Sequence, residues 1–352
     1  GISNRNGAIP PDPSGDIGVD TSTGKHYYFQ WVNLSYQAWD VTDPANPISV
    51  LGPFNGNQLW SGFGGPCQLT NHGDPIVLFD ALAGRWLVSQ FSVNSPYYQC
   101  IAVSQTANPT GAWHRYAFLY DSVKMNDYPK FGVWTDGYYM TVNQFRLSGN
   151  TWVWAGQGVV AFERDKMLDG LTARQVKFDL YDVNFNYGSL LPSDLDGLME
   201  PPAGAPNPFI AWDDGSWYGN QDAIRVWDFH VDWNNTDQST FGVAGNPNVI
   251  IPSAEVTPRL NDIPQPVTTQ RLDALGDRLM YRSQYRNFGT YQSLIGNHTV
   301  DVEGKAGLHW FELRLAPAGW EIYQQGVYAP DEHSRWMASA AQDGMGNLAI
   351  GF

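Results

Sequence analysis

The sequence predicts an all-β fold, specifically a β-propeller of four-stranded antiparallel blades, on three observations. Short apolar segments of strand length alternate with turns rich in Gly, Pro and Asp along the 352 residues. A strand–turn–strand pattern recurs, with turn glycines 60, 53, 60, 79 and 68 residues apart. Each interval has room for four short strands, which is typical of propeller blades. The six turn glycines are Gly24, Gly84, Gly137, Gly197, Gly276 and Gly344.

The first three repeats have the clearest strand order, and the second is the sharpest. Its apolar segment 74–80 and its Trp-containing segment 85–92 flank a short turn from Asp80 to Gly84, to which we assign a turn role only. A helical turn is expected at 165–170, ended by a glycine. The expected strands lie in a hairpin at 16–33, then at 35–41, 47–52, 74–80, 85–92, 97–106, 112–118, 128–134, 138–145, 156–164 and 174–180.

The last three repeats are less regular, and a Pro-rich connection at 246–267 separates the fourth from the fifth. The sixth repeat stops after two strands at residue 352. Either the N-terminal arm, residues 1–14, supplies its missing strands, or the natural chain continues further. The expected strands lie at 189–197, 207–214, 223–233, 239–244, 271–275, 278–286, 291–300, 307–315, 320–328, 335–343 and 347–352.

A closed ring explains why such repeats fold together. One twisted blade cannot bury both of its faces, whereas blades packed around an axis bury each other and leave only short edges. We therefore expect a single propeller domain over residues 1–352 with six or seven blades. A pair of stacked β-sandwiches with regular hairpins is the alternative.

Composition and charge restrict the class of partner. The chain is 43% hydrophobic and 14% aromatic, so it is an ordered globular protein. Its net charge of −15 argues against nucleic acid or an anionic membrane as the partner, because both require a basic face. The acidic residues are expected to provide solubility. A weaker alternative is that some of them bind Ca²⁺.

The two cysteines and the general composition indicate export. Cys67 and Cys100 flank the strands of one repeat and fit no metal or redox motif, so we favour a disulfide over two buried thiols. Lys is scarce, while Trp, Tyr, Asn and Gly are plentiful, as in many secreted β proteins. We expect a secreted, periplasmic or cell-surface protein.

Several segments resemble known propellers. The repeats FDALAGRWLVSQF (79–91) and QDGMGNLAIG (342–351) resemble the Asp-box hairpins of sialidase-like propellers, although the full pattern S/T-x-D-x-G-x-x-W is met in no repeat. Three segments also resemble a group of large secreted bacterial propeller proteins without an assigned function: GDPIVLFDALAGRWLVSQF, MNDYPKFGVWTDGYYMTVNQF and LPSDLDG. These resemblances imply a propeller and export, and they transfer no catalytic residue.

Carboxylates near the first strand of several repeats are the first candidate site. First strands line the axis of a propeller, so their polar residues can converge at one mouth of the channel. Hydrolysis of a glycosidic bond needs one carboxyl as acid and another as base or nucleophile. The predicted catalytic residues are Asp74, Asp127 and Asp194, with Glu200 as a further acid. The alternative is that each Asp caps a loop.

The segment RLMYRSQYR (278–286) is the second candidate. On a strand, Arg278, Arg282 and Arg286 share one face, and guanidinium groups there could bind the carboxylate of an acidic sugar. Tyr and His beside a neutralised carboxylate are also what a polysaccharide lyase uses for proton abstraction. The alternative is ion pairing with Asp-rich loops. The predicted substrate-binding residues are Arg282, Arg286, Tyr285, His298, His333 and Arg335.

The sequence therefore favours a secreted carbohydrate-active propeller, a glycoside hydrolase with carboxylates at the channel mouth. Two alternatives stay open, a non-catalytic propeller that binds sugar or protein and a lyase acting on an acidic polysaccharide. No organic cofactor is expected, since no phosphate-binding loop, nucleophile elbow or zinc motif is present.

Overall fold

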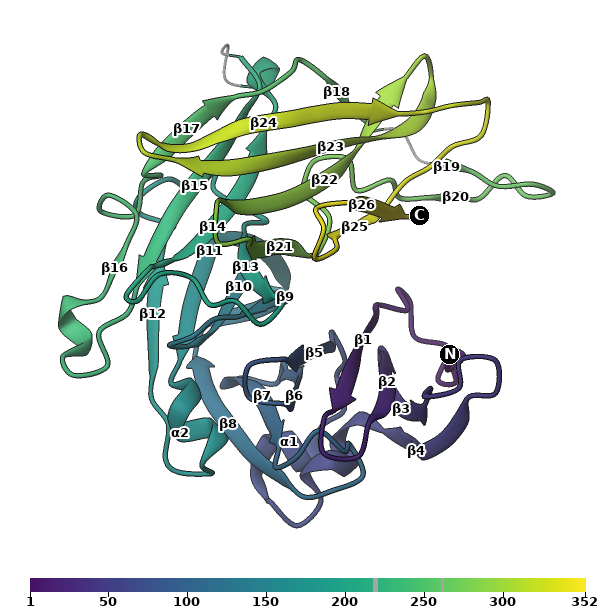
Figure 1. Cartoon of the computed structure of the whole chain (residues 1–352), viewed down its shortest axis with the longest axis vertical. Helices are drawn as coiled ribbons and strands as arrows, with labels where there is room; N and C mark the ends of the chain where they lie inside the picture. Colours follow the sequence, from purple (N-terminus) through teal and green to yellow (C-terminus); the bar gives the residue numbers. More distant parts are fainter. Residues whose placement is uncertain (218–220, 261–262) are drawn as a thin grey trace. The chain divides into compact units, whose positions relative to one another are not determined.

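A computed structural model of the chain describes residues 1–217, 221–260 and 263–352 (Figure 1). The polypeptide divides into two compact units, residues 1–186 and 187–352, and each is described by itself. Strands account for 52% of the chain and helices for 6%, so the predicted all-β class is confirmed. In the part of the chain that is described, no helix is long and apolar enough to cross a membrane.

Unit 1 consists of three four-stranded antiparallel meanders, in which each strand pairs with the next one along the chain. This is the blade architecture that the first three repeats predict. The first meander comprises β1 (Pro13–Asp20), β2 (Lys25–Val32), β3 (Ser35–Asp40) and β4 (Ile48–Asn55); the second β5 (Ile76–Asp80), β6 (Arg85–Ser92), β7 (Tyr97–Ser104) and β8 (Trp113–Asp121); the third β9 (Lys124–Val133), β10 (Tyr138–Ser148), β11 (Thr151–Phe162) and β12 (Gln175–Asp179).

Short helices lie between strands of unit 1. The 3-10 helix η1 (Gly56–Trp60) and helix α1 (Gly65–Leu69) lie between the first two. Helix α2 (Arg164–Leu168) follows β11, where a helical turn is predicted. Gly170 lies just after α2 with φ +69°, a left-handed conformation that favours glycine and ends helices.

Aromatic side chains hold the first two meanders of unit 1 together. Phe29 and Trp86 are fully buried with ring centroids 5.6 Å apart. Gly18 of β1 lies directly against this cluster, because a Cβ there would be 2.4 Å from the Phe79 ring. The indole N–H of Trp86 donates to the Ala107 carbonyl at 2.7 Å, so the buried polar atom is satisfied.

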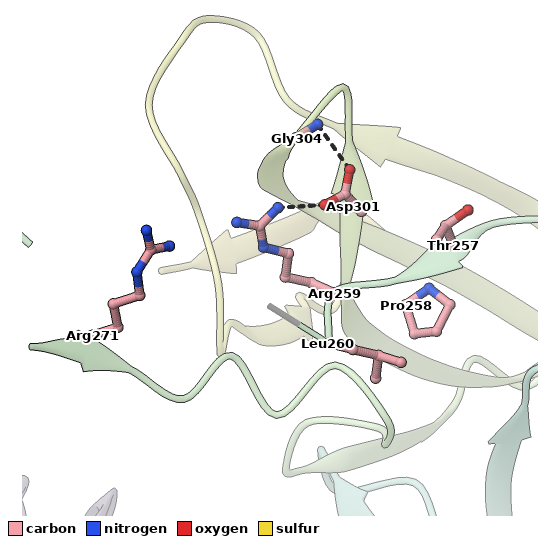
Figure 2. A pocket seen from close by; sticks show the side chains of 7 residues that line it. All are labelled: Thr257, Pro258, Arg259, Leu260, Arg271, Asp301 and Gly304. Carbon is pink, nitrogen blue, oxygen red and sulfur yellow. Dashed lines mark hydrogen bonds and ion pairs between the residues drawn. The ribbon is translucent and has the colours of Figure 1, made fainter. Parts of the chain in front are cut away.

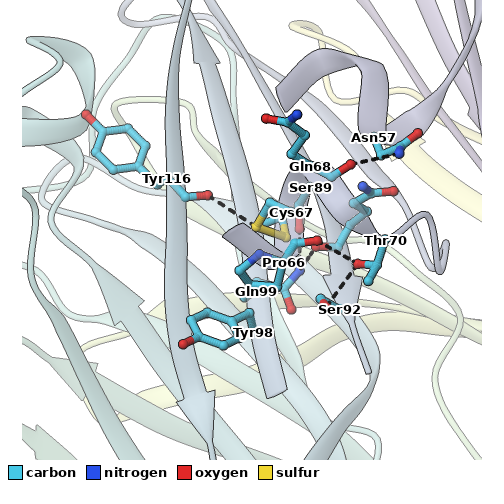
Figure 3. The surroundings of a disulfide bond; sticks show 12 residues. Asn57, Pro66, Cys67, Gln68, Thr70, Ser89, Ser92, Tyr98, Gln99 and Tyr116 are labelled. Carbon is cyan, nitrogen blue, oxygen red and sulfur yellow. Dashed lines mark hydrogen bonds between the residues drawn. A yellow bond between two sulfur atoms is a disulfide. The ribbon is translucent and has the colours of Figure 1, made fainter. Parts of the chain in front are cut away.

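The predicted disulfide is present in unit 1. Cys67 of α1 and Cys100 of β7 are bonded, and the Cys67 sulfur lies 4.0 Å from the carbonyl oxygen of Tyr116 (Figure 3). The bond attaches the connection between the first two meanders to the buried face of the second. Nearby, the Thr70 hydroxyl contacts the Ser92 hydroxyl at 3.0 Å.

Asp80 does more than the predicted turn chemistry. Its Oδ1 accepts the turn N–H of Ala83 at 3.0 Å, and its Oδ2 accepts from Arg164 Nε at 2.7 Å and from the Tyr138 hydroxyl at 2.9 Å. Asp80 is fully buried, so these bonds compensate a charge withdrawn from water. The assignment of a turn role alone is wrong, since Asp80 also ties the second meander to the third.

Unit 2 contains two four-stranded meanders joined through their first strands. Ser193–Asp196 of β13 pairs in parallel with Ser283–Arg286 of β21. The fourth meander is β13 (Leu191–Asp196), β14 (Asn207–Asp213), β15 (Ala223–His230) and β16 (Thr240–Phe241), and the fifth is β21 (Ser283–Asn287), β22 (Gln292–Val302), β23 (Lys305–Ala316) and β24 (Gly319–Tyr328).

Shorter elements complete unit 2. Strand β17 (Val249–Pro252) pairs with β15, and β18 (Thr257–Pro258) pairs with β22. Strands β19 (Ile263–Pro264) and β20 (Arg271–Leu272) form a two-stranded sheet, as do β25 (Ser339–Gln342) and β26 (Leu348–Gly351). The 3-10 helices are η2 (Gly215–Trp217) and η3 (Thr236–Gln238).

The fifth repeat begins later than predicted. Strand β20 pairs with β19 and not with the fifth meander, so its assignment as the first strand of a blade is wrong. The segment 278–286 is not one strand either, because β21 begins only at Ser283. Before that strand, Leu279 forms an isolated bridge with His298.

The propeller prediction is therefore supported at the level of its repeating unit. The described residues form five four-stranded antiparallel meanders and the hairpin β25–β26, where the sixth repeat is expected. The ring of six or seven blades and the single domain stay predictions.

Candidate functional site

Two aspartates that precede the first strands of neighbouring meanders form a carboxyl pair in unit 1. Asp12 lies directly before β1, and Asp74 lies two residues before β5. Both have left-handed backbones, with φ of 41° and 47°. Non-glycine residues rarely adopt this conformation, and strained positions of this kind cluster at functional sites.

The two side chains are hydrogen-bonded to each other, with Asp12 as donor. Asp12 Oδ2 also accepts from Asn33 Nδ2 at 2.8 Å. Asp74 Oδ2 accepts the backbone N–H of Tyr128 at 3.1 Å. Lys130 lies close enough for its positive charge to act on both carboxyl groups.

Burial and mutual repulsion set the protonation of this pair. Burial raises the pKa of Asp12 to about 6, and the negative charge of Asp74 adds to the shift. Burial also raises the pKa of Asp74, while Lys130 and the Tyr128 N–H oppose that rise. Two carboxyls this close cannot both ionise easily, so the pair holds one shared proton up to about pH 6.

Local backbone features bring these groups together. Gly73 adopts φ +93° and lies so close to Asn33 that a Cβ would be 2.1 Å from its Oδ1. The β9–β10 pairing shifts register next to Tyr128, so that β9 has one more residue there than β10. The φ angle of Tyr128 is +55°. This β-bulge lets the Tyr128 N–H bond Asp74 in place of a strand neighbour.

Side chains of β1 hold it against β5 beside the pair. The Val77 N–H donates to Ser14 Oγ at 3.0 Å, and the Phe79 N–H donates to Asp16 Oδ2 at 2.8 Å. The neighbouring His72 accepts the Val93 N–H at Nδ1, and burial lowers the pKa of its imidazole.

Asp127, the second predicted catalytic residue, directly precedes Tyr128 in β9. It is half-buried and stands opposite Asn143 of β10. It is therefore one residue from the backbone N–H that bonds Asp74.

Asp194, the third predicted residue, lies in unit 2 in a different environment. It is buried and forms an ion pair with Arg282, which also bonds Asp196 Oδ2 at 2.7 Å. Arg286 lies nearby, because a Cβ at Gly197 would be 2.7 Å from its Nη1. The pairing of Arg282 with both aspartates is the ion-pairing alternative considered from the sequence.

Glu200, proposed as a further acid, is solvent-exposed in the loop after β13. Its backbone carbonyl accepts from Asn287 Nδ2 at 2.6 Å. A general acid active near neutral pH usually needs burial to keep its proton, and this position does not provide it.

The predicted alignment of three arginines on one strand face is wrong, because the strand does not extend that far. Arg278 precedes β21 and pairs with the adjacent Asp277 at 2.7 Å. Tyr285 is buried, its hydroxyl donates to Gln292 Oε1 at 2.7 Å, and burial raises the pKa of that phenol.

The predicted histidines lie apart from one another. His298 is fully buried, contacts His309 at 2.8 Å between ring nitrogens and stacks on Trp212 with ring centroids 4.1 Å apart. Burial and His309 hold the pKa of His298 well below its usual range. His333 is exposed, and both it and Arg335 bond Asp331, at 3.2 and 2.8 Å.

Unit 2 also contains a hollow of about 880 Å³ that the sequence does not predict (Figure 2). Arg259 is paired with Asp301, which also accepts the Gly304 N–H at 2.8 Å, while Arg271 extends from β20. Arg259 is thus already engaged by a carboxylate. Within the described ranges, no group of three or more His, Cys, Asp or Glu residues is arranged to hold a metal ion.

Sequence reasoning missed Asp12 and Lys130. A usable signal was present for Asp12, since Asp12-Pro13 repeats the Asp74-Pro75 dipeptide at the corresponding place in the next meander. No sequence signal indicates Lys130, whose role depends on the bulge that precedes it.

No family model matches the chain, and no curated protein matches it. Among solved structures, similarity is found to the GH43_1 enzyme from Xanthomonas citri complexed with xylose (12% identity, 93% of each chain covered, TM-score 0.37). The arabinanase Arb43A of Bacillus subtilis is also similar, with 12% identity, coverage of 90% of this chain and 98% of that chain, and a TM-score of 0.40. The alpha-L-arabinanase of Cellvibrio cellulosa is similar too, with 11% identity, coverage of 97% of this chain and 94% of that chain, and a TM-score of 0.32.

These neighbours carry names of carbohydrate-active enzymes and not of sialidases. Identities of 11–12% and TM-scores of 0.32–0.40 establish neither a common fold nor a common activity.

Proposed function

We propose that this protein is a secreted carbohydrate-active β-propeller that hydrolyses glycosidic bonds at the Asp12–Asp74 pair. The observation that carries the proposal is a half-buried carboxyl pair, located just before the first strands of two neighbouring meanders, whose side chains are hydrogen-bonded to each other. Pairs of titratable groups whose environments shift their pKa values are typical of acid–base catalysis.

In this proposal Asp74 is the general base. Asp12 holds the proton, so Asp74 stays ionised, and the Tyr128 N–H and Lys130 stabilise its charge. Asp74 would take a proton from the water that attacks the anomeric carbon, while an acid protonates the departing sugar oxygen.

The acid must be a third carboxyl. Catalytic carboxyls that flank a glycosidic bond are about 5–9.5 Å apart, whereas Asp12 and Asp74 are bonded to each other. We assign this role to Asp127, which adjoins the Tyr128 contact in β9. Asp12 then acts as a positioning residue that tunes Asp74.

The lyase alternative receives less support from the same residues. It needs an accessible tyrosine and histidine beside arginine, whereas Tyr285 and His298 are buried and have partners within unit 2. Arg282 is already paired with two carboxylates.

Export and a polysaccharide partner belong to the same proposal. A disulfide between Cys67 and Cys100 is stable mainly in oxidising compartments. The net charge of −15 argues against nucleic acid and anionic membranes as partners.

A screen for hydrolysis of neutral and acidic polysaccharides tests the proposal, with Asp74→Asn, Asp127→Asn and Asp12→Asn beside the wild type. We expect Asp74→Asn and Asp127→Asn to lower kcat by roughly 10²–10⁴-fold, the usual contribution of a general acid or base. Asp12→Asn should mainly shift the pH profile of kcat.

Asp182→Asn is the matched control, because Asp182 is an exposed aspartate of the same unit. It should retain full activity. The proposal is wrong if a hydrolytic activity survives unchanged in Asp74→Asn, or if the folded wild type hydrolyses none of the saccharides. Saccharide binding without hydrolysis would instead indicate the binding-module alternative.

A further inference from the structure

Unit 1 contains a hollow of about 200 Å³ that shares no lining residue with the carboxyl pair. Three segments form it, namely β8, the loop before α1 and the turn just after α2. It is smaller than the roughly 300–1,000 Å³ of sites for drug-sized ligands, so it suits one ring of a longer ligand. Its lining residues are Phe63, Trp113, His114, Arg115, Tyr116 and Gly170.

Phe63 is the aromatic wall of this hollow and is 40% exposed. It stands between Gly62 and Gly64, which have φ of +76° and +82°, and a Cβ at either glycine would meet no atom within 4 Å. The Phe63 N–H bonds the Trp60 carbonyl at 2.9 Å, and the Gly64 N–H bonds Gln68 Oε1 at 2.7 Å. The loop is therefore held in a conformation that leaves an aromatic face in solvent.

Arg115 supplies the polar wall. Its guanidinium carbon lies 5.7 Å from the centroid of the Phe63 ring, and Nη1 donates to the Ser61 carbonyl at 2.7 Å. A guanidinium has five N–H donors in a planar fork that matches a carboxylate, so one backbone hydrogen bond leaves most of them available.

The lining of the hollow differs in charge from the whole chain, although Asp169, next to Gly170, acts on the Tyr116 phenol from outside the lining. The net charge is −15, yet the lining contains an arginine and a histidine and no carboxylate. Gly170 adjoins His114 so closely that a Cβ would be 2.2 Å from its Nδ1, which leaves no room for a side chain on that wall. Charge complementarity therefore favours an anionic ligand with an apolar face.

We propose that this hollow is a second saccharide-binding site, which takes one uronic acid residue of an acidic oligosaccharide. The C–H face of the sugar ring stacks on Phe63, and the carboxylate accepts hydrogen bonds from Arg115. The site shares no residue with the Asp12–Asp74 pair, so it binds the saccharide without taking part in its cleavage.

The disulfide pre-orders this site. Cys67 lies two residues after Gly65 at the end of the Phe63 loop, and its sulfur contacts the carbonyl oxygen of Tyr116, a lining residue (Figure 3). Its partner Cys100 stands opposite Ala117, next to Tyr116 on β8. A loop fixed in its binding conformation loses less entropy when a ligand binds.

Isothermal titration calorimetry with an oligogalacturonide tests the proposal, with a neutral oligosaccharide of the same length as the comparison. The titrated protein is Asp74→Asn, so that cleavage cannot consume the probe. We expect millimolar or tighter binding of the acidic probe, about tenfold weaker binding of the neutral one, and loss of affinity at high salt.

Arg115→Met and Phe63→Ala, each combined with Asp74→Asn, should raise Kd about tenfold or more. Phe185→Ala is the matched control, since Phe185 is a 59% exposed phenylalanine elsewhere in the same unit, and it should leave Kd unchanged. Circular dichroism confirms that the variants are folded.

The proposal is overturned if the folded Arg115→Met or Phe63→Ala protein binds the acidic probe as well as the parent does. It is also overturned if the acidic and neutral probes bind equally, or if neither binds. None of these outcomes depends on hydrolysis, so failure here and failure of the proposed catalytic pair are separate results.

Discussion

Both units have aspartates at or just before the first strand of a meander, but these aspartates have different surroundings. In unit 1, Asp74 before β5 meets a second carboxyl, Asp12, with Lys130 nearby. In unit 2, Asp194 and Asp196 of β13 meet a guanidinium, Arg282. Unit 1 also carries both cysteines of the chain, joined to each other.

The difference shows that position in a repeat does not fix the chemistry of an aspartate. A like charge keeps a proton on one carboxyl, so the pair in unit 1 can exchange protons near pH 6. In unit 2, Arg282 pairs with both Asp194 and Asp196, so this cluster is an ion-pair network with a structural role. We therefore place chemistry in unit 1 and stability in unit 2.

The largest expected effect is that of the disulfide on unit 1. Reduction, or the double replacement Cys67→Ser and Cys100→Ser, opens a loop whose ends are 33 residues apart. Loop entropy predicts a loss of about 3–4 kcal/mol in the free energy of unfolding. Hydrogen exchange followed by mass spectrometry should show faster exchange in peptides of residues 1–186. Equal acceleration in peptides of residues 187–352 would contradict a disulfide that acts on one unit.

A smaller effect is expected for Arg282→Met, and it should appear in unit 2. The substitution leaves Asp194 buried without its cation, which we expect to cost about 2–3 kcal/mol, somewhat below a fully buried pair because Arg282 is 21% exposed. Urea unfolding measures the loss, and hydrogen exchange assigns it to residues 187–352. Arg282→Lys, which keeps the charge, should cost less. If Arg282→Met instead abolishes hydrolysis without destabilising unit 2, the structural role is wrong.

The smallest expected effect is a gain in stability from Asp12→Asn, and it depends on pH. The pKa of Asp12 is raised in the folded state, so its contribution to stability is complete below about pH 4 and is lost as the pH rises to about 6. The amide that replaces the carboxyl in Asp12→Asn stays neutral, so the variant does not lose stability as the pH rises. We expect the variant to exceed the wild type by about 1 kcal/mol at pH 7.5, a value reduced for solvent screening.

The same comparison at pH 4 supplies the control for Asp12→Asn. There the wild-type carboxyl is already protonated in the folded state, so the two proteins should be about equally stable. Urea unfolding at both pH values measures the difference. A gain that is the same at pH 4 and pH 7.5 would mean that the shared proton is not its cause.

Much of the fold was predictable from the sequence because hairpins are local. Asp80 and Gly84 flank a turn of a few residues, and Gly84 has φ +62°, which glycine adopts without strain. The same logic predicted hairpins at Gly24 and Gly137. The structure has β1–β2 at Gly24, β5–β6 at Gly84 and β9–β10 at Gly137. The pairing of Cys67 with Cys100 was also predicted, since the chain has only two cysteines.

The fifth repeat was predicted less well because composition misled the assignment. The segment 278–286 alternates basic and aromatic residues as a strand would, but Leu279 and Met280 are consecutive and both buried. In the structure Leu279 forms an isolated bridge with His298, and the strand begins only at Ser283. The predicted Arg278–Arg282–Arg286 face failed for the same reason.

The candidate site was only half predictable. Asp74 was identified from its place before a first strand, whereas its partner Asp12 was not, although both precede proline. The sequence by itself determined the class of fold, the turn positions, the acidic charge and the list of candidate carboxylates, because each depends on neighbours in the chain. The tertiary structure alone decided which carboxylates meet another carboxylate and which meet Arg282, since proton affinity depends on charges close in space and on burial.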